Sequence, residues 1–400
     1  MTEDTLPAIA GGQPIRSDIL QFAQASLDDN EFEEMVDTLK SGWLTYGPKS
    51  IRFEKLFSDY IGVKNSIAVN SCTSGLHLSL LALGIGPGDE VITTDLTFVA
   101  TCEVILHVGA TPILVDIDDT FNIDITKIEK VITDKTKAII PVHFGGQPCQ
   151  MDEILKIKKK YNISIIEDAA HASGSKYKDQ KIGQIGDVTI FSFYANKNMT
   201  TGEGGIVTTN NSKIAEKVRT LSLHGISKDA WSRFSEKGKW YYEVTELGYK
   251  YNFTDIQASL GIHQLDKLDS FNAKRSNIAE KYTTSFTNNN VIKMPRQINH
   301  IINSWHLFPV IIEFTKLSIG RDFFIKALEA EGIKTSVHYV PIHMQPFYKI
   351  KYSFLDNDYP IALNYYKNII SLPIYPDMDN KDTNSVIKAV NKIIKYYKKL

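Results

Sequence analysis

Seven short runs of apolar, often β-branched residues recur through the first two-thirds of this 400-residue chain, and they constrain its fold more than any other feature. The runs occupy residues 66–70, 90–94, 111–117, 137–144, 163–168, 187–193 and 204–209. Between several of them lie helical patterns, at residues 74–84, 151–162 and 213–221. Strands that are apolar throughout and alternate with helices are typical of a mostly parallel sheet with helices on both faces. The sequence therefore predicts an α/β fold.

The pattern changes after about residue 265. A strand-like run at 306–314 is followed by a helical pattern at 321–333 and by a second strand-like run at 334–340. In the last segment, 382–400, apolar residues recur at helical spacing, and lysines gather at the C-terminal end, where the helix dipole favours them. We therefore predict a large domain over residues 1–265 and a smaller α+β domain over residues 266–400.

The charge balance argues against two classes of partner. The formal net charge is -1, so the chain has no basic excess to attract nucleic acid or an anionic membrane. No apolar run is long enough to span a bilayer, and the first residues lack the pattern of a secretory signal. We therefore expect a cytoplasmic protein.

The three cysteines, Cys72, Cys102 and Cys149, lie far apart, and the sequence contains neither a CxxC pair nor an HExxH motif. It indicates no disulfide framework and no metal held by protein side chains.

Polar residues follow the predicted strands at the ends where open parallel sheets bind ligands. Thr73 and Ser74 lie where a helix starts, which suits a phosphate, although serine and threonine there also act as ordinary helix caps. Phe98 follows the strand at 90–94 and could stack on a planar cofactor, although an aromatic residue there is more often part of the core.

Two further strands end in groups that are costly to bury. Asp168 closes the run at 163–168, and His171 lies three residues on; a helix-capping aspartate with a satisfied histidine is the ordinary alternative. The run at 187–193 delivers Ser192 and then Lys197, which could also be a surface lysine. Together, however, a phosphate cup, a stacking ring, an aspartate and a lysine are what pyridoxal phosphate (PLP) requires.

Six segments, which include the residues above, resemble a known family. Residues 42–50, 88–103, 110–118, 138–154, 165–205 and 248–265 are similar to the DegT/DnrJ/EryC1/StrS sugar aminotransferases, which are fold-type-I PLP enzymes. The resemblance runs nearly end to end. It implies a seven-stranded large domain, a smaller C-terminal domain, and PLP as cofactor.

The resemblance also implies a role for each matching residue. Lys197 would form the Schiff base with PLP and move the proton, Asp168 would pair with the pyridine nitrogen, and His171 would lie beside the 3-hydroxyl group. Phe98 would stack on the ring. The phosphate would be held by three hydroxyl groups, those of Thr73, Ser74 and Ser192.

Other matching residues are implied to bind beyond the ring. Asn252 would reach the phosphate in the neighbouring subunit, which implies an obligate homodimer with shared active sites. His338 and Tyr339 match a segment that lines the sugar-nucleotide side. Weaker matches for the same pocket are Trp43, Thr45 and Lys250.

The segment 223–252 resembles family members that act at C4 of a UDP-linked 4-keto-6-deoxy sugar, with L-glutamate as the usual amine donor. A 3-keto nucleotide sugar or a cyclitol ketone is the alternative substrate. Dehydratases of the family carry histidine where this chain has Lys197, so we favour amine transfer over deoxygenation. A PLP-fold protein that binds without turnover is disfavoured by Lys197, Asp168 and Ser192 together. A dinucleotide-binding oxidoreductase is disfavoured because no GxGxxG motif follows a strand.

Overall fold

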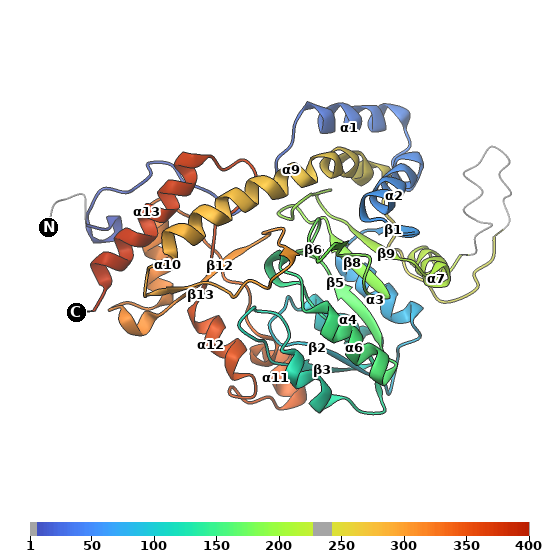
Figure 1. The fold of residues 1–400 in the computed structure, drawn as a ribbon. Coiled ribbons are helices and arrows are strands. Elements are labelled where there is room, and N and C mark those ends of the chain that lie inside the picture. The colour runs from blue at the N-terminus through green and yellow to red at the C-terminus, as the bar shows by residue number, and fades with distance from the viewer. Residues whose placement is uncertain (1–5, 227–241, 400) are drawn as a thin grey trace.

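The computed structural model describes residues 6–226 and 242–399 (Figure 1). Its main sheet has seven strands in the order β1-β9-β8-β5-β4-β2-β3. The strands are β1 (Asn65–Val69), β2 (Glu90–Thr94), β3 (Thr111–Val115), β4 (Thr136–Ile140), β5 (Ser164–Asp168), β8 (Val188–Ser192) and β9 (Gly205–Thr209). Each falls within or next to one of the seven predicted runs. The strands from β8 to β3 pair in parallel, and only β9 runs antiparallel to both of its neighbours, so the mostly parallel sheet is confirmed.

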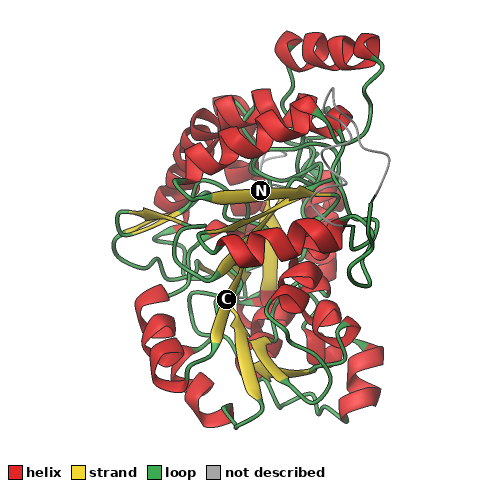
Figure 2. Ribbon diagram, turned by 90° about the vertical axis from the view of Figure 1, so that its right-hand side faces the viewer, coloured by secondary structure: helices red, strands yellow, loops and turns green. Residues whose placement is uncertain are grey.

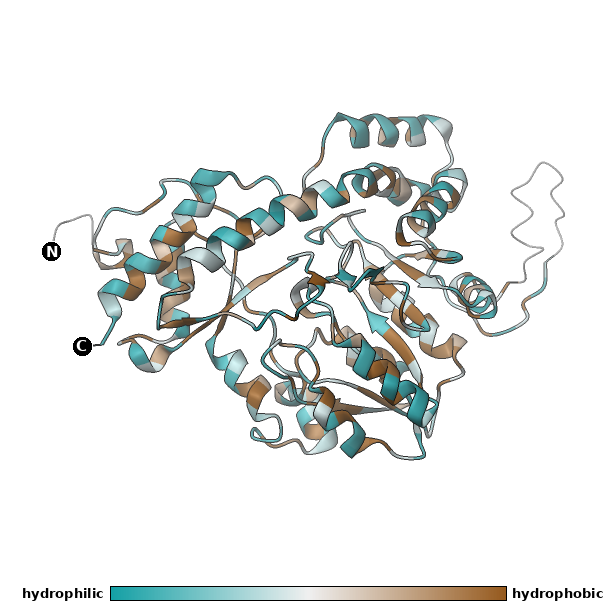
Figure 3. Ribbon diagram, viewed as in Figure 1, coloured by the Kyte–Doolittle hydropathy of each residue, from teal (hydrophilic) through white to brown (hydrophobic). Residues whose placement is uncertain are grey.

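Helices cover both faces of this sheet, because successive side chains of a strand point to opposite sides. One face packs against α3 (Cys72–Ala82), α4 (Ala100–His107) and α7 (Ser212–Ser222). The other face packs against α2 (Pro48–Ile61), α6 (Met151–Tyr161) and the first half of α9 (Asp255–Phe286). In β1, for example, Ile67 and Val69 join the first core and Ala68 joins the second. Figure 3 shows the same pattern, with brown strands and with helices such as α6 that carry both brown and teal residues.

The C-terminal part is built on a second, three-stranded sheet of β10 (Ile292–Lys293), β12 (Phe308–Ile312) and β13 (Ile369–Leu372). Its core contains the second half of α9, α10 (Arg321–Ala330) and α13 (Asn380–Tyr397). Two shorter helices, α11 (Pro346–Tyr352) and α12 (Pro360–Asn368), precede β13. The predicted strand at 306–314 and the predicted helices at 321–333 and 382–400 are therefore present.

The predicted strand at 334–340 is wrong. Within this segment only Ser336 pairs with the sheet, through a single antiparallel bridge to Ser371 of β13. The strand that completes the sheet is β13 itself, next to β12. After Ser336 the chain leaves the sheet edge and brings His338 and Tyr339 to a cavity in front of the large sheet. The β-branched run therefore reflects a partly buried connection and no strand.

The remaining elements lie at the periphery. A third, small sheet pairs β11 (Ile301–Ile302) with β6 (Lys176–Tyr177) and β7 (Gln180–Lys181), and α5 (Ile125–Ile128) is a single turn. Helix α1 (Asp29–Ser41) stands at the outer edge of the molecule, as Figure 2 shows, and contacts α9. None of the helices in the described ranges is long and apolar enough to cross a membrane.

Helix α9 joins the two parts of the chain. It begins against the large sheet and ends in the core of the C-terminal sheet, so the predicted domain boundary at residues 265/266 falls inside one continuous helix of 32 residues. The division into domains 1–265 and 266–400 stays a prediction. Part of the segment 223–252, on which the substrate prediction depends, lies outside the described residues, namely 227–241.

Candidate active site

A cavity of about 330 Å³ opens at the carboxyl ends of β5 and β8, beside the start of α3. Eight of the residues singled out in the sequence line it, although they come from distant segments: Thr73, Phe98, Asp168, His171, Ser192, Lys197, His338 and Tyr339. Phe98 is 58% exposed and lines this cavity, so its ring is accessible to a ligand there.

Lys197 lies in the turn that follows β8, where its backbone N–H donates to the carbonyl of Tyr194 at 2.9 Å. The surrounding protein lowers the pKa of the Lys197 amine to about 8, because burial disfavours the charged form more than the Asp168 carboxylate favours it. On the order of a tenth of the amine is therefore neutral at pH 7, far more than for a lysine with the ordinary pKa. A neutral amine is the form that can attack a carbonyl carbon.

Asp168 is the last residue of β5 and is almost fully buried. Its Oδ2 accepts a hydrogen bond from the Thr101 hydroxyl at 2.8 Å, and its Oδ1 accepts one from the Ala170 N–H at 3.1 Å. Burial raises the pKa of this carboxyl, and the two hydrogen bonds oppose the rise. Because both donors are neutral, a cationic pyridinium N–H in the cavity would offset the cost of burying the charge.

The hydrogen bonds of His171 determine its tautomer. The Gly145 N–H donates to Nδ1 at 3.2 Å, so the ring proton must lie on Nε2, which then donates to the Tyr339 hydroxyl oxygen at 3.0 Å. Burial, together with the nearby Lys197, lowers the pKa of His171 well below its usual range and keeps the ring neutral. The hydroxyl hydrogen of Tyr339 is therefore available for a second hydrogen bond.

The start of α3 forms the other end of the cavity. Ser71 caps this helix by accepting the Ser74 N–H at 3.1 Å, and the Ser74 hydroxyl donates to Asn70. Ser74 does not line the cavity, whereas Thr73 and Ser192 do. The N-terminus of an α-helix attracts anions, so this end suits a phosphate. The lysine, the buried carboxylate and the anion site together fit PLP.

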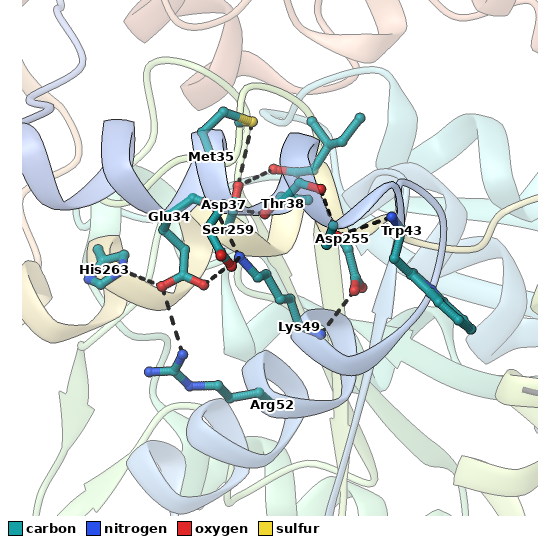
Figure 4. Close-up of polar contacts among 12 residues, drawn as sticks. Glu34, Met35, Asp37, Thr38, Trp43, Lys49, Arg52, Asp255, Ser259 and His263 are labelled. Carbon is teal, nitrogen blue, oxygen red and sulfur yellow. Dashed lines mark hydrogen bonds and ion pairs between the residues drawn. The ribbon is translucent and has the colours of Figure 1, made fainter. Parts of the chain in front are cut away.

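Besides Ser74, four predicted site residues lie outside this cavity. Trp43 lies in the connection between α1 and α2 (Figure 4), where its indole N–H donates to the carbonyl of Tyr46 at 3.1 Å. Thr45 follows it, and its carbonyl accepts the Asp255 N–H. Asn252 bridges to Val69 at the end of β1, and Lys250 bridges to Leu223. Their proposed roles stay predictions.

The cavity also contains residues that the sequence did not reveal. Thr97 bonds to Thr101, which in turn holds Asp168, and both threonines line the cavity after β2. Their spacing of four residues, one helical turn, in an otherwise mostly apolar segment after a strand is the signal that could have indicated them. The buried His306 ring lies against His171 with ring centres 4.4 Å apart, and its position directly before an apolar strand gave no sign of this contact.

Comparison with known proteins identifies the family. The model of the DegT/DnrJ/EryC1/StrS aminotransferase family matches residues 25–391. The chain belongs to this family. It is 53% identical to an uncharacterized protein of Methanocaldococcus jannaschii over 381 residues. This alignment covers 95% of this chain and 99% of the relative. It is 47% identical over 382 residues to the spore coat polysaccharide biosynthesis protein SpsC of Bacillus subtilis, covering 95% and 98% of the two chains.

Solved structures support the same family assignment. The protein Spr1654 of Streptococcus pneumoniae, assigned as a sugar aminotransferase and solved in its PMP-form, superimposes with a TM-score of 0.88 and 36% identity, over 94% of this chain and 99% of that one. It was also solved in a PLP-form. The predictions of family, fold type I, transaminase-type enzyme and PLP cofactor are therefore confirmed, and the dinucleotide-binding alternative is set aside.

Proposed function

We propose that this aminotransferase moves the amine of L-glutamate to C4 of a nucleotide-linked 4-keto-6-deoxy sugar, with UDP as the nucleotide. The observation that carries the amine-transfer step is the joint position of Lys197 and Asp168 in one cavity. Support for a sugar as acceptor comes from SpsC, whose name places it in polysaccharide biosynthesis. Support for C4 and UDP comes from the resemblance of segment 223–252.

The proposed roles follow from the protonation states of the side chains. Bound PLP supplies the electron sink and carries the amine between the two substrates. The Lys197 amine, neutral above a pKa of about 8, would carry the proton between the substrate carbon that loses or gains the amine and the cofactor carbon that takes it up or hands it on. Asp168 would hold the ring nitrogen in its cationic form. Thr101 fixes the direction of the Asp168 carboxylate by donating to Oδ2.

The sugar is proposed to lie between Phe98 and the segment that carries His338 and Tyr339. The Tyr339 hydroxyl accepts from His171 and can donate its own hydrogen to an oxygen of the sugar. Burial and the charge of Lys197 lower the pKa of His338 to about 4, so this ring too is neutral in the working pH range. A neutral donor can bind a sugar oxygen without placing a second positive charge beside Lys197.

We also propose that the working unit is a homodimer. Asn252, Lys250, Trp43 and Thr45 do not line the cavity of their own chain. If these residues act in catalysis, they must reach the cavity of a second copy, which matches the role that the family resemblance implies for Asn252.

The decisive test compares wild type with Lys197→Ala in a visible absorbance experiment with added PLP, before and after L-glutamate. Wild type should show the band of lysine-bound PLP, and glutamate should bleach it. Lys197→Ala should not form this band and should lose amine transfer by at least about 1,000-fold. The matched control is Lys178→Ala, which removes an exposed lysine that pairs with Asp152 and should behave as wild type.

UDP-4-keto-6-deoxyhexose is then offered as the acceptor, with a 3-keto nucleotide sugar beside it. Restoration of the PLP band by the 4-keto sugar alone supports the proposed substrate. Full turnover by Lys197→Ala would defeat the mechanism, and a PLP band that glutamate leaves unchanged would exclude glutamate as the donor.

A further inference from the structure

Two buried aspartates stand at the carboxyl ends of neighbouring parallel strands, outside the set of residues assigned above. Asp95 follows β2 and Asp116 follows β3, and their exposed fractions are 0% and 4%. Both aspartates accept hydrogen bonds from backbone N–H groups of the C-terminal part of the chain. A buried carboxylate is costly unless donors of this kind satisfy it. The backbone N–H groups therefore stabilise Asp95 and Asp116 in their buried positions.

Asp95 makes three contacts with two consecutive residues. Its carbonyl accepts the Ile342 N–H at 2.9 Å, its Oδ1 accepts the His343 N–H at 2.8 Å, and its Oδ2 lies 2.6 Å from Nδ1 of His343. The His343 side chain is also fully buried, and its Nε2 has no hydrogen-bond partner within residues 6–226 and 242–399. Asp95 is therefore the polar group that holds this ring in place.

The pair lies a few residues along the chain from two rings that line the proposed sugar pocket. Asp95 precedes Phe98 by three residues, and His343 follows Tyr339 by four residues. The Phe98 and Tyr339 rings line the cavity with their centres 5.9 Å apart. Phe98 is carried by the segment that follows strand β2 of the large sheet. Tyr339 is carried by a segment of the C-terminal part. The contacts between Asp95 and residues 342–343 join these segments next to the rings.

Asp116 shows what the same kind of contact does elsewhere. Its carboxylate accepts the N–H groups of Ile361 and Ala362, at 3.1 and 2.9 Å, where α12 begins. Neither Asp116 nor these two residues line the cavity. Asp116 thus anchors the C-terminal part to the same sheet edge, and within the described residues it makes no hydrogen bond to the segments that carry the two rings.

We propose that Asp95 and His343 are positioning residues for the sugar substrate, which fix the separation of Phe98 and Tyr339 across the sugar pocket. Loss of the pair lets the 338–343 segment shift relative to the loop after β2. A displacement of about 1 Å at a binding site, even far from the reacting bond, can cost on the order of 100-fold in rate. The inference rests on the proposed function, because it assigns the sugar to this side of the cavity.

The test measures KM for the nucleotide sugar, kcat, PLP affinity and Tm in four holoenzyme variants. Asp95→Asn weakens the acceptor, and His343→Phe keeps a ring but removes its N–H donor. His343→Asn keeps a donor near the position of Nδ1 and should restore most of the function. Asp116→Asn is the matched control, because it weakens a buried backbone anchor of the same sheet edge.

Asp95→Asn and His343→Phe should raise KM for the sugar about tenfold, with PLP affinity changed less than about twofold. Asp116→Asn should lower Tm about as much as Asp95→Asn does, but it should leave KM for the sugar unchanged. If Asp95→Asn and His343→Phe lower Tm but leave KM at the wild-type value, the pair is only structural and the inference is overturned. If wild type itself aminates no nucleotide sugar, the proposed function fails first and the inference falls with it.

Discussion

The charge of a single amine decides how this protein captures its cofactor. Lys197 has a pKa of about 8 because burial disfavours its protonated form, and only the neutral amine can attack the PLP aldehyde. Raising the pH through this pKa removes the proton. We therefore expect the rate of PLP capture by cofactor-free protein to rise about tenfold per pH unit below about pH 8 and to level off above it.

Stopped-flow absorbance with PLP over about pH 6 to 9.5 measures this profile, and Lys197→Ala supplies the blank for unspecific reaction with other lysines. A rate that still rises about tenfold per pH unit at pH 9.5, as for a lysine with the ordinary pKa of 10.5, would mean that Lys197 is solvated in the cofactor-free protein.

Single residues of the site differ in how far the sequence reveals them. Asp168 and Lys197 were predictable because a charge next to an apolar strand needs a partner or a function. Thr101 and His306 carry no such signal, since threonine is common in strands and helices and a single histidine is usually a core residue. Their contacts with Asp168 and His171 arise only when distant segments meet.

At the scale of elements, the large sheet followed from the sequence and the C-terminal sheet followed only in part. The seven strands of the large sheet are buried on both faces, which produces mostly apolar runs that end at polar segments. In the C-terminal part, β13 has four residues directly after α12, so its pattern is too short to separate from the helix. The longer run at 334–340 resembled a strand more closely, although it forms only the Ser336 bridge.

The contact between β9 and α3 illustrates an element-scale constraint at the site. Gly205 opens β9, and a Cβ atom there would lie 2.6 Å from the Cys72 backbone nitrogen, at the start of the helix that forms the anion site. Because the neighbouring atoms are backbone, Gly205→Ala must push β9 and α3 apart. We expect it to lower the free energy of unfolding by about 1–3 kcal/mol and to weaken PLP binding.

Chemical denaturation and PLP titration measure these two effects. Gly86→Ala is the control, since the nearest atom to its added Cβ lies at 3.8 Å, and it should match wild type in both. Equal stability and equal PLP affinity for the two variants would show that β9 and α3 separate without cost and that the approach is not needed for the anion site.

At the scale of the whole molecule, the position of Asn252 bears on assembly. It lies at the end of β1, where its side-chain N–H donates to the Phe253 carbonyl at 2.9 Å, and it does not line the cavity of its own chain. Lys197 lines that cavity. If a homodimer shares its active sites, each site combines Lys197 of one copy with Asn252 of the other.

Mixed dimers test this arrangement. Lys197→Ala and Asn252→Ala should each have little activity alone. After the two proteins are unfolded, mixed in equal amounts and refolded, about half of the dimers carry one variant of each kind, and in each of these one of the two sites has both wild-type residues. Activity should therefore recover to about a quarter of wild type. If Asn252 acted within its own chain, every mixed site would lack one residue, and mixing would restore nothing.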